Sequence, residues 1–391
     1  MGAEGDGGTV SLPLFVGFGV AATGGPLALA ALYAPGTVSS LPSIGLVAVL
    51  AALLFALPIA VWYRYSEQVA SSGGLFSFVE AAAGRRLALL QGGVWIVSYS
   101  LYLPYTITYI VYQLLPAAFP GVRPYRPLLE VLLPVAIAAL AALRFRAALV
   151  VVAAIAVAQL CILLALAIVG MADVGVSAGA FGAHGRIAPL ARGSANVSLL
   201  YVCASLPLFL GGEVRGGSRT VRKGVVVGFG VAAASVLLGV LPWAHARASV
   251  VEARIPGVSL ARAAWGHPFA SVAALGVVAS VAGVVIAEYF ALGRLLHAMS
   301  GRSVRQMTGL VAAAFVAASL VSLVNPDAFY NDLVKPSLIA LWVSQFLVFA
   351  VYPRFTGRHR RLQPGGVGLA VAAAALMAYG LYSAVTLVSS T

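Results

Sequence analysis

Charged residues are scarce in this chain of 391 residues, because Lys, Arg, Asp and Glu together make up only 9% of it. Hydrophobic residues make up 61%. A soluble domain has roughly a quarter charged residues, so water cannot be the solvent for most of this sequence. No polar stretch is long enough to fold by itself. The sequence therefore predicts one integral membrane domain over residues 1–391, with the lipid bilayer as its main partner.

Cysteine and histidine are also rare. The two cysteines, Cys161 and Cys203, lie inside apolar runs, where each is interpreted as a small buried hydrophobe. The five histidines are scattered near predicted helix ends or in loops, without metal spacing and without a nucleophile beside them. We therefore predict no disulfide framework, no metal site and no catalytic residue. The chain is not expected to be an enzyme or to need a cofactor beyond a coupled ion.

Acidic residues are outnumbered by basic ones, 11 against 24, which gives a net charge of +13. The basic residues lie in short clusters between apolar runs, where positive charge sets membrane orientation, and so no nucleic-acid partner is expected. With the N-terminus inside, roughly two thirds of them are cytoplasmic. The segment 1–8 has Glu4 and Asp6 but no Lys or Arg, and is not a cleavable signal peptide. We expect a multi-pass plasma-membrane protein with a cytoplasmic N-terminus and with Thr391 outside.

The apolar runs are mostly close to the ~20 residues that a helix needs to cross a bilayer. They predict eleven spans, at Ser11–Tyr33, Ser43–Tyr63, Leu87–Leu115, Pro127–Leu143, Ala147–Ala172, Ser194–Gly212, Gly224–His245, Pro268–His297, Gln306–Leu323, Phe329–Tyr352 and Gly366–Leu387.

The first run contains the sequence Thr23-Gly24-Gly25-Pro26 in its middle. Gly and Pro are the two poorest helix formers, and Pro also lacks the N–H that a helix needs. This cluster predicts a break in the first span. In hydrocarbon a broken backbone survives only where it lines a cavity or is buried in protein. The break is therefore a candidate binding site.

The third run carries an aromatic stripe in which one residue follows another every three or four positions, namely Trp95, Tyr99, Tyr102, Tyr105, Tyr109 and Tyr112. At about 100° per residue these side chains cluster on one side of the helix. For Tyr109 and Tyr112, near the outer end, we favour a packing stripe or an interfacial belt. Tyr99 and Tyr102 lie nearer the midplane and are better candidates for lining a substrate site. Before this run, the loop 62–86 predicts a short amphipathic helix at the inner surface.

The sixth run repeats the anomaly of the first, because Pro207 falls inside the apolar stretch Leu200 to Phe209. A single proline usually only kinks a membrane helix. Spans one and six, however, are equivalent members of two five-helix halves, and interruptions at corresponding places point to a midplane transporter site. Five is odd, so the halves are inverted. The repeats are expected at about residues 11–172 and 194–352, followed by a peripheral helix at about 366–387.

The chain resembles the amino acid-polyamine-organocation (APC) transporter superfamily, whose fold is the five-plus-five inverted repeat of the leucine-transporter type. The similarity runs from about Phe15 to Phe355. It is carried by motifs in the correct order: Thr23-Gly24-Gly25 at the helix-one break, Ser72 to Phe78 followed by Gly84, Gly93 and Trp95 leading into helix three, Glu213 to Arg222 after helix six, and Gly293 to Met299 closing helix eight. The resemblance implies an all-α integral membrane fold of about 11 transmembrane helices with helices 1 and 6 broken.

The sixth span departs from the family where many members have an aromatic residue, then Gly and Phe-Glu. Cys203-Ala204-Ser205-Leu206-Pro207 stands there instead, without the aromatic lid and the acidic residue. The free N–H groups of a half-helix can receive a carboxylate, and the carbonyls of a half-helix C-terminus can receive an ammonium group. The predicted substrate-binding residues are Ala21, Ala22, Thr23, Gly24, Gly25, Tyr99, Tyr102, Cys203, Ala204 and Ser205. Since none is acidic, we expect an amino acid with a neutral or apolar side chain.

Energy coupling is left open between H⁺ and Na⁺. By the resemblance, Gln159 stands where some members have a Lys in helix five, and it cannot titrate. Ser280 lies near the place of a sodium site in related transporters. Glu288 is interpreted as the only carboxylate well inside a span, where an ionisable group is costly and usually functional. It is a candidate proton site, with a salt bridge to a cytoplasmic Arg as the alternative.

The leading hypothesis is a secondary active transporter of small or neutral amino acids that works by alternating access, as a symporter or an antiporter. The alternatives are a channel, membrane enzyme or sensor that uses the same fold, or a carrier of another small organic solute such as an amine. A channel would usually show a filter repeat or charged rings, and an enzyme a titratable cluster, and neither is visible.

Overall fold

The computed structural model describes residues 8–38, 41–142, 145–359 and 364–386. The segment 1–7, Thr391 and the predicted boundaries Leu143 and Leu387 lie outside these residues. Nearly all of the described chain is helical, and it contains no strand, only one bridged pair, Val10 and Val214.

The α-helices are α1 (Leu12–Ala22), α2 (Pro26–Ala28), α3 (Ala34–Thr37), α4 (Ile44–Tyr65), α5 (Leu75–Ala83), α6 (Arg85–Tyr109), α7 (Leu115–Ala118), α8 (Arg126–Ala142), α9 (Phe145–Val174), α10 (Ile187–Leu199), α11 (Gly217–Val240), α12 (Ala248–Val251), α13 (Pro256–Ser300), α14 (Val304–Ser322), α15 (Pro326–Ala350), α16 (Tyr352–His359) and α17 (Pro364–Thr386). The π-helical elements are η1 (Leu29–Tyr33) and η3 (Ile110–Leu114). The 3-10 elements are η2 (Leu41–Ser43), η4 (Pro120–Tyr125), η5 (Ala178–Phe181), η6 (Val202–Glu213) and η7 (Leu241–Ala244).

Ten helical stretches of the described chain are long and apolar enough to cross a bilayer, and each corresponds to a predicted span. The remaining predicted span, Pro127–Leu143, is α8, whose 17 described residues are fewer than in any of those ten. The predicted amphipathic helix in the loop 62–86 is α5, which buries Leu75, Phe76 and Phe78.

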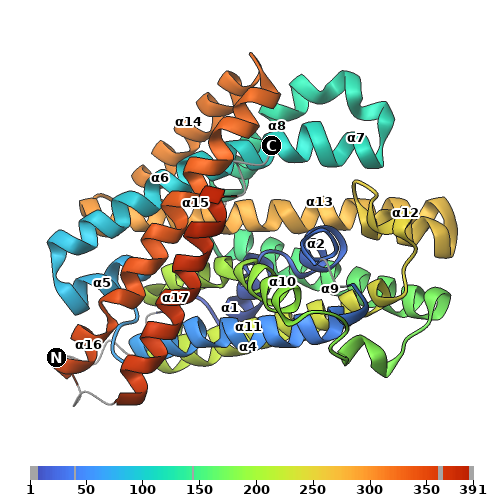
Figure 1. Ribbon diagram of the computed structural model, residues 1–391. Coiled ribbons are helices and arrows are strands. Elements are labelled where there is room, and N and C mark those ends of the chain that lie inside the picture. The colour runs from blue at the N-terminus through green and yellow to red at the C-terminus, as the bar shows by residue number, and fades with distance from the viewer. Residues whose placement is uncertain (1–7, 39–40, 143–144, 360–363, 387–391) are drawn as a thin grey trace.

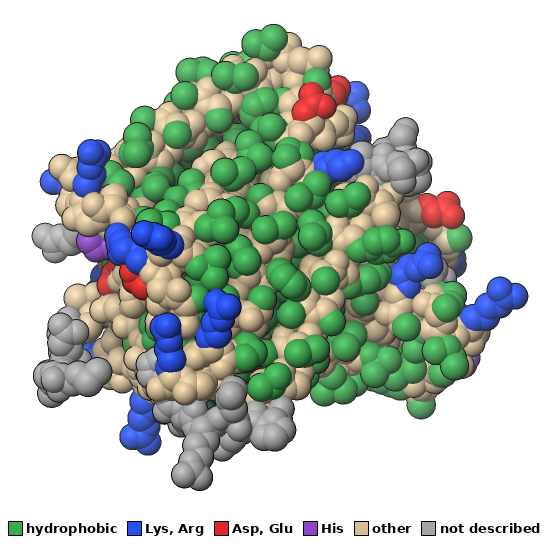
Figure 2. All heavy atoms as spheres, turned by 60° about the vertical axis from the view of Figure 1, so that its left-hand side comes forward, with side chains coloured by type: hydrophobic (Ala, Val, Ile, Leu, Met, Phe, Trp, Pro, Cys, Tyr) green, Lys and Arg blue, Asp and Glu red, His purple; other side chains and the backbone are tan. Residues whose placement is uncertain are grey.

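The long element α13 has a kink at Gly266, where φ is 79°, and runs through the middle of the molecule. In Figure 1, α6 and α14 lie on one side of it, α4, α10 and α11 lie on the other, and α15 crosses it. Neighbouring pairs include α6 with α15, α9 with α13, α4 with α10 and α1 with α11. Figure 2 shows a broad hydrophobic surface on one face, with Lys and Arg side chains at its borders. This distribution suits helices that face lipid in the middle and headgroups or water at their ends.

The first span is interrupted where the sequence predicts it. The α-helix stops after Ala22, and Gly24 and Gly25 have φ angles of 72° and 65°. Residues other than glycine rarely adopt that region, so two adjacent glycines permit the turn. The chain then resumes as α2 and passes into the π-helix η1.

The sixth span is also interrupted within the predicted stretch Leu200 to Phe209, but at its start rather than at Pro207. The helix α10 ends at Leu199, Leu200 and Tyr201 form a turn, and η6 then continues for 12 residues as a 3-10 helix. Runs of 3-10 helix longer than three or four residues are uncommon and often mark a hinge. Pro207 lies inside η6. The sixth span therefore changes from α-helix to 3-10 helix over most of its second half, and it is not simply an α-helix with a kink at Pro207.

Candidate functional site

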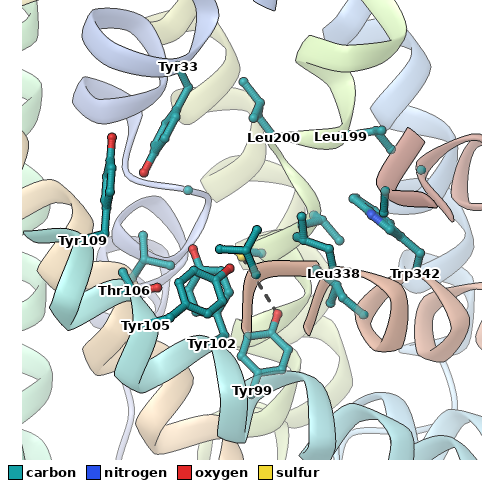
Figure 3. A pocket seen from close by; sticks show the side chains of 18 of the residues that line it. Tyr33, Tyr99, Tyr102, Tyr105, Thr106, Tyr109, Leu199, Leu200, Leu338 and Trp342 are labelled. Atoms are coloured by element: carbon teal, nitrogen blue, oxygen red, sulfur yellow. Dashed lines mark hydrogen bonds between the residues drawn. The ribbon is translucent and has the colours of Figure 1, made fainter. Parts of the chain in front are cut away.

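A cavity of about 340 Å³ lies between the two interrupted spans. Gly24, Leu29 and Tyr33 line it from the first span, and Leu199, Leu200, Val202 and Cys203 line it from the sixth. The rest of the lining comes from α6 (Tyr99, Tyr102, Tyr105, Thr106, Tyr109), α13 (Val281, Val284), α15 (Tyr330, Val334, Leu338, Leu341, Trp342) and α17 (Gly380, Ser383, Ala384). Figure 3 shows the tyrosines of α6 on one side, with Tyr33 and Leu200 opposite them and Leu338 and Trp342 beside them.

Six tyrosines dominate the polar part of this lining, and no charged side chain belongs to it among the described residues. Five of their rings form a connected chain of contacts, which runs from Tyr99 through Tyr102 and Tyr105 to Tyr330, with successive ring centroids 5.9, 5.0 and 5.8 Å apart. Tyr109 continues the chain by stacking on Tyr330 at 5.7 Å. Tyrosine combines an apolar ring with a hydroxyl that donates and accepts hydrogen bonds. The cavity is therefore apolar in surface but well supplied with hydroxyl groups.

The two interruptions meet at Gly24. A Cβ added there would lie 2.8 Å from the carbonyl oxygen of Leu200 and 2.9 Å from Leu29 Cδ2, so a side chain would collide with the sixth span. Gly24 is thus the point of close backbone approach that a glycine permits.

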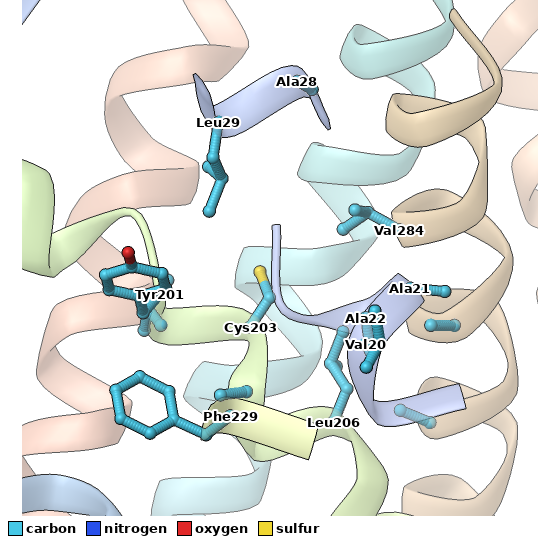
Figure 4. Packing of buried hydrophobic residues seen from close by; sticks show 14 of the residues in the cluster. Val20, Ala21, Ala22, Ala28, Leu29, Tyr201, Cys203, Leu206, Phe229 and Val284 are labelled. Atoms are coloured by element: carbon cyan, nitrogen blue, oxygen red, sulfur yellow. The ribbon is translucent and has the colours of Figure 1, made fainter. Parts of the chain in front are cut away.

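Gly25 and Thr23, on either side of Gly24, face away from the cavity. A Cβ at Gly25 would come within 2.7 Å of the Ser280 carbonyl oxygen, because the turn is packed against α13. The Thr23 hydroxyl donates to the Gly19 carbonyl at 2.6 Å, back along its own helix. Ala21 and Ala22 are fully buried in the packed cluster below the break, and neither lines the cavity (Figure 4).

In the sixth span, Cys203 is the predicted residue that reaches the cavity. Its sulfur lies 3.9 Å from the Tyr99 hydroxyl and 3.6 Å from Glu288 Oε1. Ala204 and Ser205 are buried but do not line the cavity. The Ser205 hydroxyl donates to the Val202 carbonyl and accepts from Gln345 Nε2 of α15 at 3.2 Å, which ties η6 to α15.

Glu288 of α13 lies behind Cys203 and is fully buried. Its Oε1 accepts from Cys203, and its Oε2 has no hydrogen-bond partner among the described residues. Among the described residues, no Lys, Arg or His makes a salt bridge to Glu288. The expected alternative of a salt bridge to an Arg is therefore absent from the described structure, and a buried carboxyl group lies one side chain away from the cavity.

Gln159 and Ser280 lie together on the other side of the first break. The Ser280 hydroxyl accepts from the amide of Ala28 at 3.2 Å and donates to Gln159 Oε1 at 2.5 Å. This chain of hydrogen bonds joins the start of the resumed first span to α9 and α13. Among the described residues, no three or more His, Cys, Asp and Glu side chains are grouped as a metal would require.

One end of the site is closed by packed aromatic rings and an ion pair. Trp95 stacks on Tyr99 with centroids 3.9 Å apart and contacts Phe209 of η6 at 4.7 Å. Further along η6, the guanidinium of Arg294 contacts both carboxylate oxygens of Glu213, at 2.6 and 3.1 Å. A fork of this kind holds η6 against α13.

The structure thus brings Gly24, Tyr99, Tyr102 and Cys203 together, and it adds lining residues that sequence reasoning missed. Tyr105 and Tyr109 belong to the predicted aromatic stripe, and their periodicity could have included them. Tyr33, Tyr330 and Trp342 come from distant spans and carried no local signal. The helix α17, expected to be peripheral, also lines the cavity.

Comparison with known proteins bears on the fold. No protein-family model and no curated protein matches the sequence. Among solved structures, the chain is similar to MhsT in complex with L-phenylalanine, with TM-score 0.62, 14% identity, and coverage of 94% of this chain and 98% of that one. It is also similar to a mutant of the manganese transporter of Eremococcus coleocola, with TM-score 0.65, 12% identity, and coverage of 95% and 87%.

A complex of that manganese transporter with an aromatic bis-isothiourea substituted compound gives TM-score 0.63 at 13% identity, with coverage of 95% of this chain and 87% of that chain. These similarities confirm the predicted fold, an all-helical membrane protein of the leucine-transporter type with interrupted first and sixth spans. At such low identity they show the fold alone, and the resemblance to the APC superfamily stays a prediction.

Proposed function

We propose that this chain is a secondary active transporter of neutral amino acids that works by alternating access. The observation that carries the proposal is the cavity of about 340 Å³ to which both interrupted spans contribute. Interrupted helices at corresponding places of two halves are where transporters of this kind hold their substrates. The volume is near the lower end of the range of roughly 300–1,000 Å³ that is usual for small-molecule pockets.

The backbone at the two breaks suits the two charges of an amino acid. The first amides of a helix have no acceptor within it and lie at its positive end, which favours a carboxylate. Ser280 accepts the amide of Ala28, so the carboxylate would be received by the remaining amides at the start of the resumed first span, next to Gly24, which lines the cavity. The end of α10, at Leu199 and Leu200, supplies carbonyl groups for the ammonium.

The rest of the lining favours a neutral and sizeable side chain. Leu338, Leu341 and Trp342 present apolar surface opposite the tyrosines, and no charged side chain of the described chain could pair with an acidic or basic substrate there. MhsT, which has the same fold, binds L-phenylalanine. Phenylalanine and leucine are the amino acids we expect to bind best.

A small organic amine is the second candidate, and the tyrosine cage favours it. Aromatic faces attract a cation within about 6 Å of their centres. Glu288 lies behind Cys203 without a cationic partner in the described chain, and its negative charge would add to this attraction. An amine needs no carboxylate receptor, so the two candidates differ in their use of the first break.

We further propose that Glu288 carries the coupling proton. A buried ionisable group in a membrane protein marks a proton or substrate path more often than a structural contact. The carboxyl touches Cys203, whose sulfur also contacts Tyr99 in the cavity lining, so its charge can respond to the occupant of the cavity. Gln159 and Ser280 would then hold the first break in place, or contribute oxygens to a coupled Na⁺.

Uptake into proteoliposomes tests this proposal. The protein would be reconstituted and supplied with radiolabelled phenylalanine, leucine, alanine, glutamate, arginine and phenethylamine, with and without proton or sodium gradients. We expect uptake of phenylalanine or leucine above that of protein-free liposomes. Transport of the amine alone would favour the second candidate, passive flux of many solutes would favour a channel, and no uptake or exchange of any solute would contradict transport.

The coupling assignment is tested in the same vesicles with Glu288→Gln, which removes the titrating group but keeps its shape. We expect exchange of substrate to continue while acceleration by an inward proton gradient is lost. Glu80→Gln is the matched control, because Glu80 is partly exposed and paired with Arg85 away from the cavity. Equal responses of both variants to the gradient would contradict the role of Glu288.

A further inference from the structure

A second buried carboxylate lies outside the cavity, at Glu130 of α8. Its Oε1 accepts a hydrogen bond from the Thr108 hydroxyl of α6 at 2.6 Å and another from the Ser322 hydroxyl of α14 at 2.6 Å. The three side chains come from three different helices, and none of them lines the cavity between the interrupted spans. The sequence had singled out Glu288 alone, so Glu130 is a finding of the structure.

The residues around Glu130 are buried, and some of their polar atoms lack hydrogen-bond partners. Glu130, Ser322 and the neighbouring Ser319 are each 0% exposed, and Thr108 is 1% exposed. Glu130 Oε2 and the Ser319 hydroxyl have no hydrogen-bond partner among the described residues. A buried polar atom without a partner is costly, and a water molecule or an ion can supply the missing contact.

The hydrogen-bond partners of this carboxylate in the described chain are both hydroxyl oxygens. Thr108 Oγ1 also lies 3.2 Å from the Pro104 carbonyl oxygen, and Ser322 Oγ lies 2.8 Å from the Ser319 carbonyl oxygen. Hydroxyl, carbonyl and carboxylate oxygens are the ligands that hard cations prefer.

No Lys, Arg or His of the described chain makes a salt bridge to Glu130. Of the charged groups on neighbouring elements, Arg126 lies over the ring of Tyr112 of η3 with 5.2 Å to its centroid, and its Nε donates to the Arg123 carbonyl of η4. The remaining ionisable group near Tyr112 is Asp327 at the start of α15, which is also acidic. From α6 and α14 the contacting groups are Thr108 and Ser322, which do not titrate.

We propose that Glu130, Thr108, Ser319 and Ser322 form a binding site for a monovalent cation, H⁺ or Na⁺, that neutralises the Glu130 carboxylate. An isolated carboxylate is too costly to leave charged in a membrane interior, and both cations remove that cost. A proton would reside on Oε2, and Na⁺ would be held by the carboxylate and the surrounding oxygens. The occupied site joins α14 to α6 and α8, so the cation stabilises the packing of these three helices.

Thermal unfolding of the purified protein in detergent tests this inference without requiring that it transports anything. A ligand that binds only the folded state raises the apparent Tm with its concentration. If Na⁺ is the occupant, Tm at alkaline pH rises by several degrees when Na⁺ replaces choline. If a proton is the occupant, stability is present at low pH and lost as the pH rises, whatever the Na⁺ concentration.

Glu130→Gln tests whether the change of Tm with Na⁺ or pH arises at Glu130. The amide keeps an acceptor oxygen for both hydroxyls, and it is uncharged, so it needs no cation. We expect this variant to lose the Na⁺ or pH response that the wild type shows. Glu80→Gln is the control and should keep it, because Glu80 is partly exposed and paired with Arg85, away from Glu130 and from the cavity. Ser322→Ala keeps the carboxylate and removes one hydroxyl that donates to it. If Na⁺ is the occupant, the transition should move at least threefold toward higher Na⁺ concentration. If a proton is the occupant, loss of the donor favours the protonated carboxyl, so the transition should move toward higher pH.

Ser322→Ala also gives an answer if Glu130→Gln does not fold. The proposal is overturned if the wild type responds to neither cation, if Glu130→Gln responds as the wild type does, or if the Ser322→Ala transition is not displaced. Uptake by a Glu130→Gln variant would leave the proposed transport function intact in each of these cases.

Discussion

Gly24 and Gly25 are neighbours in the first break, but their missing side chains leave room for different partners. Gly24 makes room for the Leu200 carbonyl at the cavity, whereas Gly25 makes room for Ser280 of α13. A substitution at Gly24 should therefore alter the contact between the two interrupted spans, and one at Gly25 should alter the packing that supports the site.

We predict that Gly25→Ala destabilises the protein strongly. The added methyl would combine a positive φ of 65° with a collision against Ser280, and overpacking of this kind costs about 1–3 kcal/mol. Gly217→Ala is the matched control, because Gly217 also has a positive φ, 53°, but a Cβ there would meet no atom within 4 Å. The Tm of each variant measures the difference, and equal losses would contradict the packing role of Gly25.

The Tyr102 hydroxyl is expected to contribute directly to ligand affinity. Tyr102→Phe keeps the ring between Tyr99 and Tyr105 and removes only one donor and acceptor from the cavity lining. A hydrogen bond is worth about 0.5–1.5 kcal/mol, so the Kd of a bound ligand should rise by about threefold to tenfold.

Binding of phenylalanine followed by a thermal-shift titration checks this value. Tyr125→Phe is the control, since Tyr125 is 61% exposed and outside the cavity. An unchanged Kd in Tyr102→Phe would indicate that the ligand contacts the ring alone.

At the scale of the elements, η6 is the part of the sixth span that must move if the site opens toward Glu213. It is held there by the Glu213 and Arg294 fork and by the contact of Phe209 with Trp95. Its 3-10 geometry has weaker hydrogen bonds than an α-helix, so it can rearrange at lower cost.

We predict that Glu213→Gln makes Cys203 more reactive toward a water-soluble thiol reagent. The amide leaves Arg294 without a charged partner, which weakens the closure of that end. Cys203 is 6% exposed, whereas Cys161 of α9 is exposed and could react with the reagent itself. The measurement therefore needs a Cys161→Ser background. Labelling should rise severalfold. Glu80→Gln breaks the exposed pair with Arg85 and should leave labelling unchanged, and equal labelling in both variants would contradict the closure.

The elements also show what the sequence could reveal. The break at Thr23-Gly24-Gly25-Pro26 follows from backbone preferences of its own residues and could be predicted. The turn at Leu200 and Tyr201 could not, because neither residue breaks a helix and the 3-10 path of η6 depends on packing against α1, α11 and α13. Tyr33 and Tyr330 meet the α6 tyrosines only after the helices assemble, and α17 likewise reaches the cavity through tertiary packing. Glu130 stands one turn inside a predicted span, and its burial depends on α14.

At the scale of the whole molecule, the Lys and Arg residues are more numerous at one end of the predicted spans than at the other, and this predicts the orientation in the membrane. The ion pairs Arg294 with Glu213 and Arg222 with Glu67 lie near the junction of η6 with α11, at residues 213–223, and the segment that follows α4. Short loops rich in Lys and Arg stay on the cytoplasmic side. The end that holds Glu213 should therefore face the cytoplasm, and the loop around η5 should face outward.

Single cysteines in a background without Cys161 and Cys203 test this orientation. Arg302→Cys reports on the expected cytoplasmic end and Ala178→Cys on the other, and both positions are exposed. In right-side-out vesicles an impermeant thiol reagent should label Ala178→Cys and leave Arg302→Cys unlabelled, and inside-out vesicles should reverse the result. The reverse pattern would place the closed end of the cavity outside, and the fork between Glu213 and Arg294 would then control substrate entry from the external medium instead of release into the cell.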